Sequence, residues 1–123
     1  MENKRRYNRY HTRAYCGVYD RASGKSIGCL VDLSRDGLKV MSEKPLMEDA
    51  VYKLKIVMHK EIDGTRVLEL DAKCLWNKKS MDPNFVVSGF QITEISERTF
   101  ERLCIFTKSS VFHYPETQKI KTK

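Results

Sequence analysis

Hydrophobic and polar residues alternate along most of this chain in short runs, and turn residues separate the runs. Alternation with a period of two is typical of half-buried β-strands. The pattern predicts six strands, at residues 13–21, 25–34, 38–41, 51–58, 67–76 and 85–95. Ser23-Gly24 and Asp63-Gly64 are typical hairpin turns, and Gly89 interrupts the last run in a way that indicates a bulge or a bend.

Residues 25–34 combine an apolar pattern with polar residues at its end. If the strand continues to Ser34, one face carries Ile27, Cys29, Val31 and Leu33, and the other carries Leu30, Asp32 and Ser34. We expect the first face to join the core. Asp32 and Ser34 would point outward together, and Gly37 would follow at the turn, where glycine permits a positive φ and the close approach of a ligand. Taken alone, this stretch is more typical of an ordinary surface hairpin than of a ligand site.

Two later runs predict further core residues. In residues 51–58, Val51, Leu54 and Ile56 alternate with lysines, and Tyr52 interrupts the register. In residues 67–76 one face is apolar, with Leu68, Leu70, Ala72 and Cys74. Trp76 ends this run, and we expect it in the core or at the rim, with a ligand-contacting role as the weaker alternative.

The spacing changes after the last strand. Ser96 can cap a helix and Glu97 suits its positive end. Apolar residues then follow helical spacing at Phe100, Leu103, Cys104 and Thr107. Short strands followed by one helix predict a closed or nearly closed antiparallel β-barrel with a C-terminal helix.

The 123 residues suit one domain, and 41% hydrophobic with 32% charged residues is typical of a soluble globular protein. No apolar run reaches membrane-spanning length, and no apolar segment follows the basic N-terminus. These features predict a cytoplasmic protein without membrane insertion. The four cysteines, and the isolated histidines His11, His59 and His113, lack zinc-ligand spacing. We therefore expect Cys16, Cys29, Cys74 and Cys104 to be free core thiols, with no metal.

A net charge of +7 and a pI near 9.3 favour an anionic partner, whether a nucleotide, nucleic acid or a membrane surface. The basic residues gather at the two ends of the chain. At the first end they form the run Lys4-Arg5-Arg6-Tyr7-Asn8-Arg9.

Two motifs, in this order and at this distance, resemble the PilZ domain family. That family is marked by Arg-Arg-x-x-Arg near its start and by Asp/Asn-x-Ser-x-x-Gly after the second strand. Here the first reads Arg5-Arg6-Tyr7-Asn8-Arg9, and the second reads Asp32-Leu33-Ser34-Arg35-Asp36-Gly37. Every defining position is filled, and the resemblance covers roughly residues 5–106.

The resemblance implies a six-stranded antiparallel barrel with a C-terminal helix. Together with the polar composition of the two ends, it divides the chain into a flexible basic arm at residues 1–12, the barrel and helix at 13–112, and a basic tail at 113–123 whose composition predicts disorder. It also implies a bacterial receptor for cyclic di-GMP, with no catalysis and no cofactor, that regulates motility or biofilm formation through an unidentified downstream protein. The implied ligand-binding residues are Arg5, Arg6, Arg9, Asp32, Ser34 and Gly37, with Arg5 and Arg9 as the main arginines.

These residue types suit that ligand. Arginine can bind phosphate oxygens or guanine O6 and N7, or can stack on a base, and a carboxylate such as Asp32 can accept from a guanine N–H edge. Four residues apart in an extended arm, Arg5 and Arg9 span about 13 Å. Ordering about six arm residues would cost on the order of 6–12 kcal/mol of backbone conformational entropy, so several contacts with the ligand must form before the arm becomes ordered. This dependence on the ligand predicts that the arm acts as a switch by folding over it.

Three other functions fit the sequence less well. A nucleic-acid-binding small β-barrel fits the charge, but the strands show no evident row of exposed aromatic residues, so nucleic acid is the weaker partner. An enzyme is disfavoured because the sequence has no Ser/His/Asp constellation, no metal set and no phosphate loop. A PilZ-like scaffold that has lost its ligand is disfavoured by the intact motifs.

Overall fold

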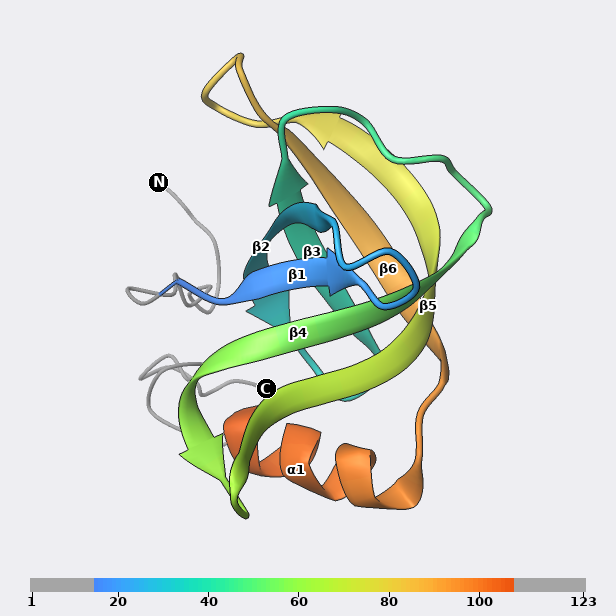
Figure 1. The fold of residues 1–123 in the computed structure, drawn as a ribbon. Helices are drawn as coiled ribbons and strands as arrows, with labels where there is room; N and C mark the ends of the chain where they lie inside the picture. The colour runs from blue at the N-terminus through green and yellow to red at the C-terminus, as the bar shows by residue number, and fades with distance from the viewer. Residues whose placement is uncertain (1–14, 108–123) are drawn as a thin grey trace, which may run out of the picture.

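The structure is a computed structural model that describes residues 15–107 (Figure 1). Six strands precede one helix in it. The elements are β1 (Gly17–Asp20), β2 (Ser26–Leu33), β3 (Gly37–Ser42), β4 (Val51–Ile62), β5 (Thr65–Lys79), β6 (Val86–Glu94) and α1 (Glu97–Thr107). The predicted arm and tail lie outside the described residues.

The strands form a closed barrel in the order β1-β2-β3-β6-β5-β4, and every neighbouring pair is antiparallel. Figure 1 shows α1 lying across one end of this barrel, below β4 and β5. The structure thus confirms the prediction of a closed six-stranded antiparallel barrel with a C-terminal helix.

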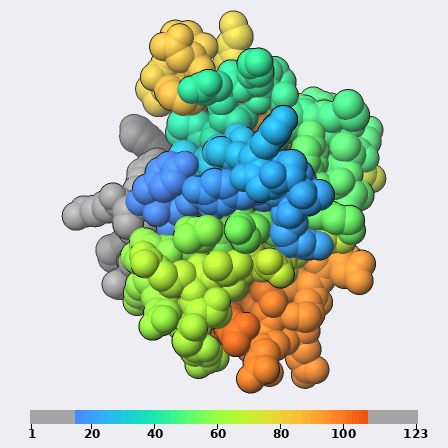
Figure 2. All heavy atoms as spheres, viewed as in Figure 1, coloured from blue at the N-terminus to red at the C-terminus, as the bar shows by residue number. Residues whose placement is uncertain are grey.

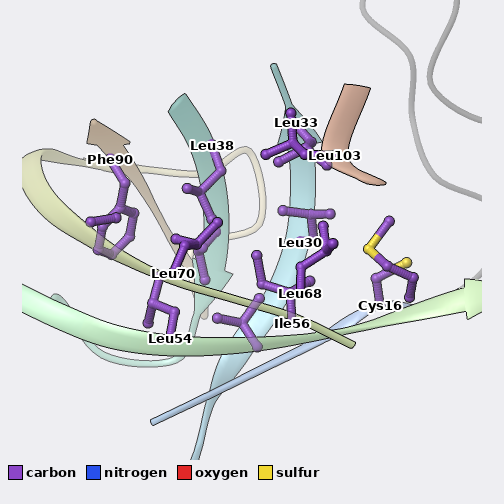
Figure 3. Packing of buried hydrophobic residues seen from close by; sticks show 14 of the residues in the cluster. Cys16, Leu30, Leu33, Leu38, Leu54, Ile56, Leu68, Leu70, Phe90 and Leu103 are labelled. Atoms are coloured by element: carbon purple, nitrogen blue, oxygen red, sulfur yellow. The ribbon is translucent and has the colours of Figure 1, made fainter. Parts of the chain in front are cut away.

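The core fills the barrel and extends to the helix. Leu103 of α1 and Leu33 of β2 belong to one cluster of buried hydrophobic residues, most of which Figure 3 shows, so the helix continues the core of the barrel. Leu103 and Phe106 are both fully buried. Each contributes about 1.5–3 kcal/mol by leaving water. The predicted apolar face of the helix included Phe100 and Cys104, which are only half-buried. It did not include Phe106, which is fully buried.

Helix α1 begins after Ser96, as the sequence predicted. The backbone N–H of Thr99 donates to the Ser96 hydroxyl over 3.1 Å, and the N–H of Phe100 donates to the Ser96 carbonyl over 2.8 Å. Glu97 occupies the first turn, where the partial positive charge of the helix favours it. The predicted cap is therefore confirmed.

Both predicted hairpin turns are present. Asp63 and Gly64 have φ values of 55° and 81° and connect β4 to β5, as expected for a two-residue turn with two positive φ angles. At the β1–β2 turn Gly24 has a φ of 79°. There the Ser23 hydroxyl and N–H both donate to the Asp20 carboxylate, and these bonds lower the pKa of Asp20.

The β1–β2 turn is fastened to β4 and β5 by Arg21. Its guanidinium donates to the carbonyl of Leu70 over 3.1 Å and to the carbonyl of Leu54 over 3.5 Å. It also pairs with Asp71 at 3.2 Å, and Asp71 pairs with Lys53 at 3.4 Å. Figure 2 shows the atoms of this turn packed against those of β4.

A β-bulge changes the face prediction for β2. Leu30 pairs with Val40 and Asp32 pairs with Lys39, so Val31 is an extra residue in the ladder. Because the extra residue shifts the alternation, Leu30 and Leu33 are both buried. The prediction that Ile27, Cys29 and Val31 form the core face was wrong; these three are half-buried, and Ile27 packs against the core.

The register of β4 also differs from the prediction. Tyr52 is in phase with the buried Leu54 and Ile56, and its ring meets Phe90 edge-on at 5.9 Å between centroids. Val51 is the residue out of phase, since it is 56% exposed. The apolar face predicted for β5 is confirmed, with Leu68, Leu70, Ala72 and Cys74 all buried.

The four cysteines are free thiols. Cys16 and Cys74 are buried, and burial raises the pKa of both, while Cys29 and Cys104 are half-buried. In residues 15–107 no group of three or more His, Cys, Asp or Glu side chains could hold a metal ion. No helix in that part of the chain combines the length and apolar character needed to cross a membrane.

Candidate functional site

A pocket of about 190 Å³ opens where β2 turns into β3 and where β5 and β6 pass beside them. Nine residues line it: Asp32, Ser34, Gly37, Leu38, Lys39, Leu75, Trp76, Gly89 and Phe90. The structure therefore brings together the three residues of the second motif that were predicted to bind a ligand. It adds an aromatic side chain from β5 that is distant in sequence.

The turn between β2 and β3 is held by Ser34. Its hydroxyl donates to Asp36 Oδ1 over 3.0 Å and accepts the N–H of Gly37 over 3.2 Å. The backbone N–H of Ser34 also donates to the Gly37 carbonyl over 2.9 Å. The carbonyl of Asp36 then accepts the N–H of Ile92, which anchors the turn to β6. Ser34 thus fixes the shape of the motif turn at the pocket edge.

Gly37 is needed for a different reason from the one predicted. Its φ is not among the positive values of the described residues. A Cβ at position 37 would instead lie 2.6 Å from the carbonyl oxygen of Phe90, because β3 and β6 approach closely there. Glycine at this position keeps β6 against the turn, and so holds Phe90 and Gly89 at the pocket.

Asp32 lies directly after the β2 bulge and is half-buried. The N–H of Leu33 donates to its Oδ1 over 3.0 Å, which fixes the carboxylate at the pocket wall. Lys39 is its partner across the strands. The wall formed by β2 and β3 therefore offers both a carboxylate acceptor and an ammonium donor.

Trp76 forms the opposite wall. It pairs with Gly89 across β5 and β6, and Leu75 is an extra residue in the β5 ladder just before it. A Cβ at position 89 would overlap Nε1, Cε2 and Cζ2 of the indole, so glycine makes room for the ring. The prediction of a bulge at Gly89 is correct in place, although the extra residue belongs to β5.

Two lysines lie over the Trp76 ring. The ammonium of Lys39 is 5.9 Å from the ring centroid and that of Lys78 is 5.1 Å from it. Both separations suit a cation–π interaction. The pocket thus has an aromatic surface bordered by positive charge, which suits a flat, anionic ligand.

The described residues carry no net formal charge. Residues 15–107 contain as many Asp and Glu as Lys and Arg side chains, so the net charge of +7 comes from residues 1–14 and 108–123. Arg5, Arg6 and Arg9 belong to the first of these segments and lie outside the described residues.

A larger polar hollow of about 390 Å³ lies on the side of the barrel near the start of α1. Its charged and hydroxyl groups largely bind each other: Arg21 and Lys53 pair with Asp71, and Ser96 bonds to Thr99. These groups stabilise the fold, so the smaller pocket beside the motif turn is the candidate site.

Comparison with known proteins identifies the family of this chain. The family model described as PilZ domain matches residues 3–106. This chain belongs to the PilZ domain family. The match covers both motifs and the whole barrel. No curated protein matches the sequence.

Several solved PilZ-containing structures share the fold. The Bacillus subtilis inhibitor of motility, MotI or DgrA, has a TM-score of 0.63 and 18% identity over 86% of this chain and 51% of its own. The PilZ domain of Escherichia coli YcgR with c-di-GMP has a TM-score of 0.57 and 19% identity over 85% of this chain and 88% of its own. MrkH from K. pneumonia, in its apo state, has a TM-score of 0.60 and 16% identity over 86% of this chain and 51% of its own.

At these identities the likeness concerns the fold. The chain spans about half the length of MotI and of MrkH. The geometry of the pocket is therefore taken from the contacts within this chain and not from the similar structures.

Proposed function

We propose that this chain is a receptor for cyclic di-GMP that has no catalytic activity of its own. The observation that carries the proposal is the pocket in which Asp32, Ser34 and Gly37 of the PilZ motif meet Trp76. Family membership supports it, since the YcgR PilZ domain of the same fold was solved with this ligand.

The pocket residues take distinct roles in this proposal. The Asp32 carboxylate accepts from the N–H edge of a guanine, a pairing that arginine or lysine could not provide. Trp76 offers an aromatic surface on which that guanine can stack. Ser34 and Gly37 act by holding the turn, because the Ser34 hydroxyl is already bonded to Asp36 and Gly37.

The arm supplies the phosphate-binding charge. Gly17 pairs with Cys29, and the N–H of Leu30 donates to the Cys16 carbonyl over 2.8 Å. In an antiparallel pair, moving backward from Gly17 means moving forward along β2, towards Asp32. The arm therefore leaves the barrel on the side of Asp32, and in this proposal it folds back over the pocket, where the guanidinium groups of Arg5, Arg6 and Arg9 can bind phosphates and guanine O6 and N7.

Binding would then order the arm. Holding about six residues costs on the order of 6–12 kcal/mol, and each charged hydrogen bond returns about 1.5–3 kcal/mol. Several contacts must therefore form together, which makes arm ordering dependent on the ligand. The ordered arm is the signal that a downstream protein would recognise.

The charge distribution supports this proposal over the nucleic-acid alternative. A barrel that binds a polyanion along its strands would carry excess positive charge on them, whereas residues 15–107 are balanced. A ligand with two phosphates needs a few cations at one place, which the arm arginines provide.

The test is a calorimetric titration of the full chain with cyclic di-GMP, cyclic di-AMP, GTP and single-stranded RNA. We expect saturable binding of cyclic di-GMP in preference to the others, since adenine lacks O6 and presents a donor in its place. Binding of RNA that weakens steeply with salt, with no cyclic di-GMP binding, would favour the nucleic-acid alternative. Equal binding of cyclic di-AMP and cyclic di-GMP would overturn the claim that the site recognises guanine in preference to adenine.

A further inference from the structure

We propose that Lys78 is a phosphate-binding residue of the cyclic di-GMP site, held on the Trp76 ring in the free protein and released when a base stacks there. This inference rests on the proposed function and extends it to a residue outside both motifs. It assigns to β5 a charged contact that the arm and the β2–β3 turn do not supply.

The first observation is the environment of Trp76. The backbone of Gly89 occupies one side of the indole, because no Cβ would fit between them. The Lys78 ammonium lies 5.1 Å from the ring centroid, closer than that of Lys39 at 5.9 Å. A guanine that stacks on Trp76 from the pocket must therefore compete with an ammonium for the remaining aromatic surface.

The second observation is the freedom of Lys78. Its side chain is exposed, and among the described residues it makes no ion pair with a carboxylate. Lys53, by contrast, is paired with Asp71. The cation–π contact of Lys78 is exposed to solvent and worth about 0.5–1 kcal/mol, so a phosphate can replace the ring as its partner at little cost.

The third observation is the charge at the pocket. Asp32 and Lys39 are the two charged residues that line it, and they balance each other. The ligand brings two phosphate charges beside the Asp32 carboxylate. The Lys78 ammonium lies over the ring of Trp76, which lines the pocket, so it can offset this repulsion. Its flexible four-carbon stem lets the ammonium move from the ring to a phosphate oxygen.

The chain offers a matched control. Lys79 follows Lys78 on β5, is also exposed, and has no contact with the Trp76 ring among the described interactions. Lys78→Met and Lys79→Met each remove one positive charge and keep an apolar stem of similar length. Both variants should keep the wild-type fold, which thermal unfolding verifies.

The experiment is a titration of wild type, Lys78→Met and Lys79→Met with cyclic di-GMP and with guanosine, followed by the fluorescence of Trp76, the one tryptophan of the chain. We expect Lys78→Met to weaken cyclic di-GMP binding about fivefold, the size of an exposed ion pair, and Lys79→Met to leave it within about twofold. Guanosine has no phosphate, so Lys78→Met should bind it as well as wild type or better.

The outcomes separate the two proposals. If wild type does not bind cyclic di-GMP, the proposed function fails. If wild type binds it and the two lysine variants weaken it equally or not at all, the role of Lys78 is overturned while the receptor function stands. If Lys78→Met weakens guanosine as much as cyclic di-GMP, Lys78 acts on the base or on the fold, and the phosphate contact is overturned.

Discussion

The indole of Trp76 occupies the space that a side chain at position 89 would fill, so Trp76 and Gly89 can lie opposite each other because one of them is glycine. This relationship joins the strand ladder of β5 and β6 to the wall of the candidate site. It also makes the position of the aromatic ring sensitive to a residue that a ligand need not touch.

Gly89→Ala should displace the Trp76 ring. The added Cβ would overlap three indole atoms, and overpacking of this kind costs about 1–3 kcal/mol of unfolding free energy. We expect a lower urea midpoint, a shifted Trp76 emission and weaker cyclic di-GMP binding. The double variant Gly89→Ala/Trp76→Ala removes the clash, so it should be less destabilised than the sum of the two single changes. Strictly additive losses would mean that the ring does not depend on Gly89.

Ser34→Ala should loosen the motif turn. It removes the hydrogen bonds of the Ser34 hydroxyl to Asp36 and Gly37, at a cost of about 0.5–1.5 kcal/mol of unfolding free energy. Ligand binding should weaken as well. Ser80→Ala is the matched control, because the Ser80 hydroxyl likewise donates to and accepts from Asp82 in the β5–β6 turn, outside the pocket. Equal effects of both variants on ligand affinity would argue against a role for Ser34 at the site.

The arm should become protected when ligand binds. We expect the amides of residues 5–9 to pass from fast to slow hydrogen exchange at saturating cyclic di-GMP, while the barrel amides change little. Mass spectrometry of peptides from the two states measures this. Protection of residues 5–9 before ligand is added, or none at saturation, would contradict signalling through arm ordering.

The buried thiols should be unreactive at mildly alkaline pH. Burial raises the pKa of Cys16 and of Cys74, so each stays protonated as the pH rises through the usual thiol range, and the thiolate is the reactive form. Alkylation at pH 8, followed by peptide mass spectrometry, should label Cys16 and Cys74 slowly in the folded protein and rapidly in urea. Rapid labelling of Cys74 without urea would mean that β5 opens readily.

The alternation of polar and apolar residues was enough to predict the barrel, because each strand buries one face. It predicted the buried face of β5 correctly, and the Asp63-Gly64 dipeptide correctly predicted the turn that precedes β5. It failed at β2, where Val31 adds a residue to the ladder and moves Leu30 to the core. A bulge depends on the partner strand, so one strand's own sequence does not reveal it.

The candidate site could likewise be predicted only where its residues are close in sequence. Asp32, Ser34 and Gly37 are close in sequence and form one turn, so the motif could be read directly. Trp76 and Gly89 come from other strands, and the extra residue at Leu75 sets their pairing. The sequence therefore placed Trp76 in the core or at the rim, with a ligand contact as the weaker alternative, but it did not show that Trp76 lines the same pocket as the motif turn. The close approach of Phe90 to Gly37 likewise depends on how β3 meets β6.

The most direct test of the account is calorimetric titration of cyclic di-GMP into four proteins: wild type, Asp32→Ala, Arg9→Ala and Asp82→Ala. Asp32→Ala removes the base-edge acceptor, and Arg9→Ala removes an arm cation. A base contact of this kind is worth about 1–3 kcal/mol, so each should lower the affinity by about one to two orders of magnitude. Asp82→Ala removes the same negative charge as Asp32→Ala, but Asp82 lies outside the pocket. The affinity of Asp82→Ala for cyclic di-GMP should therefore match that of wild type. Wild-type affinity in both Asp32→Ala and Arg9→Ala would contradict the claim that this pocket and its arm bind cyclic di-GMP.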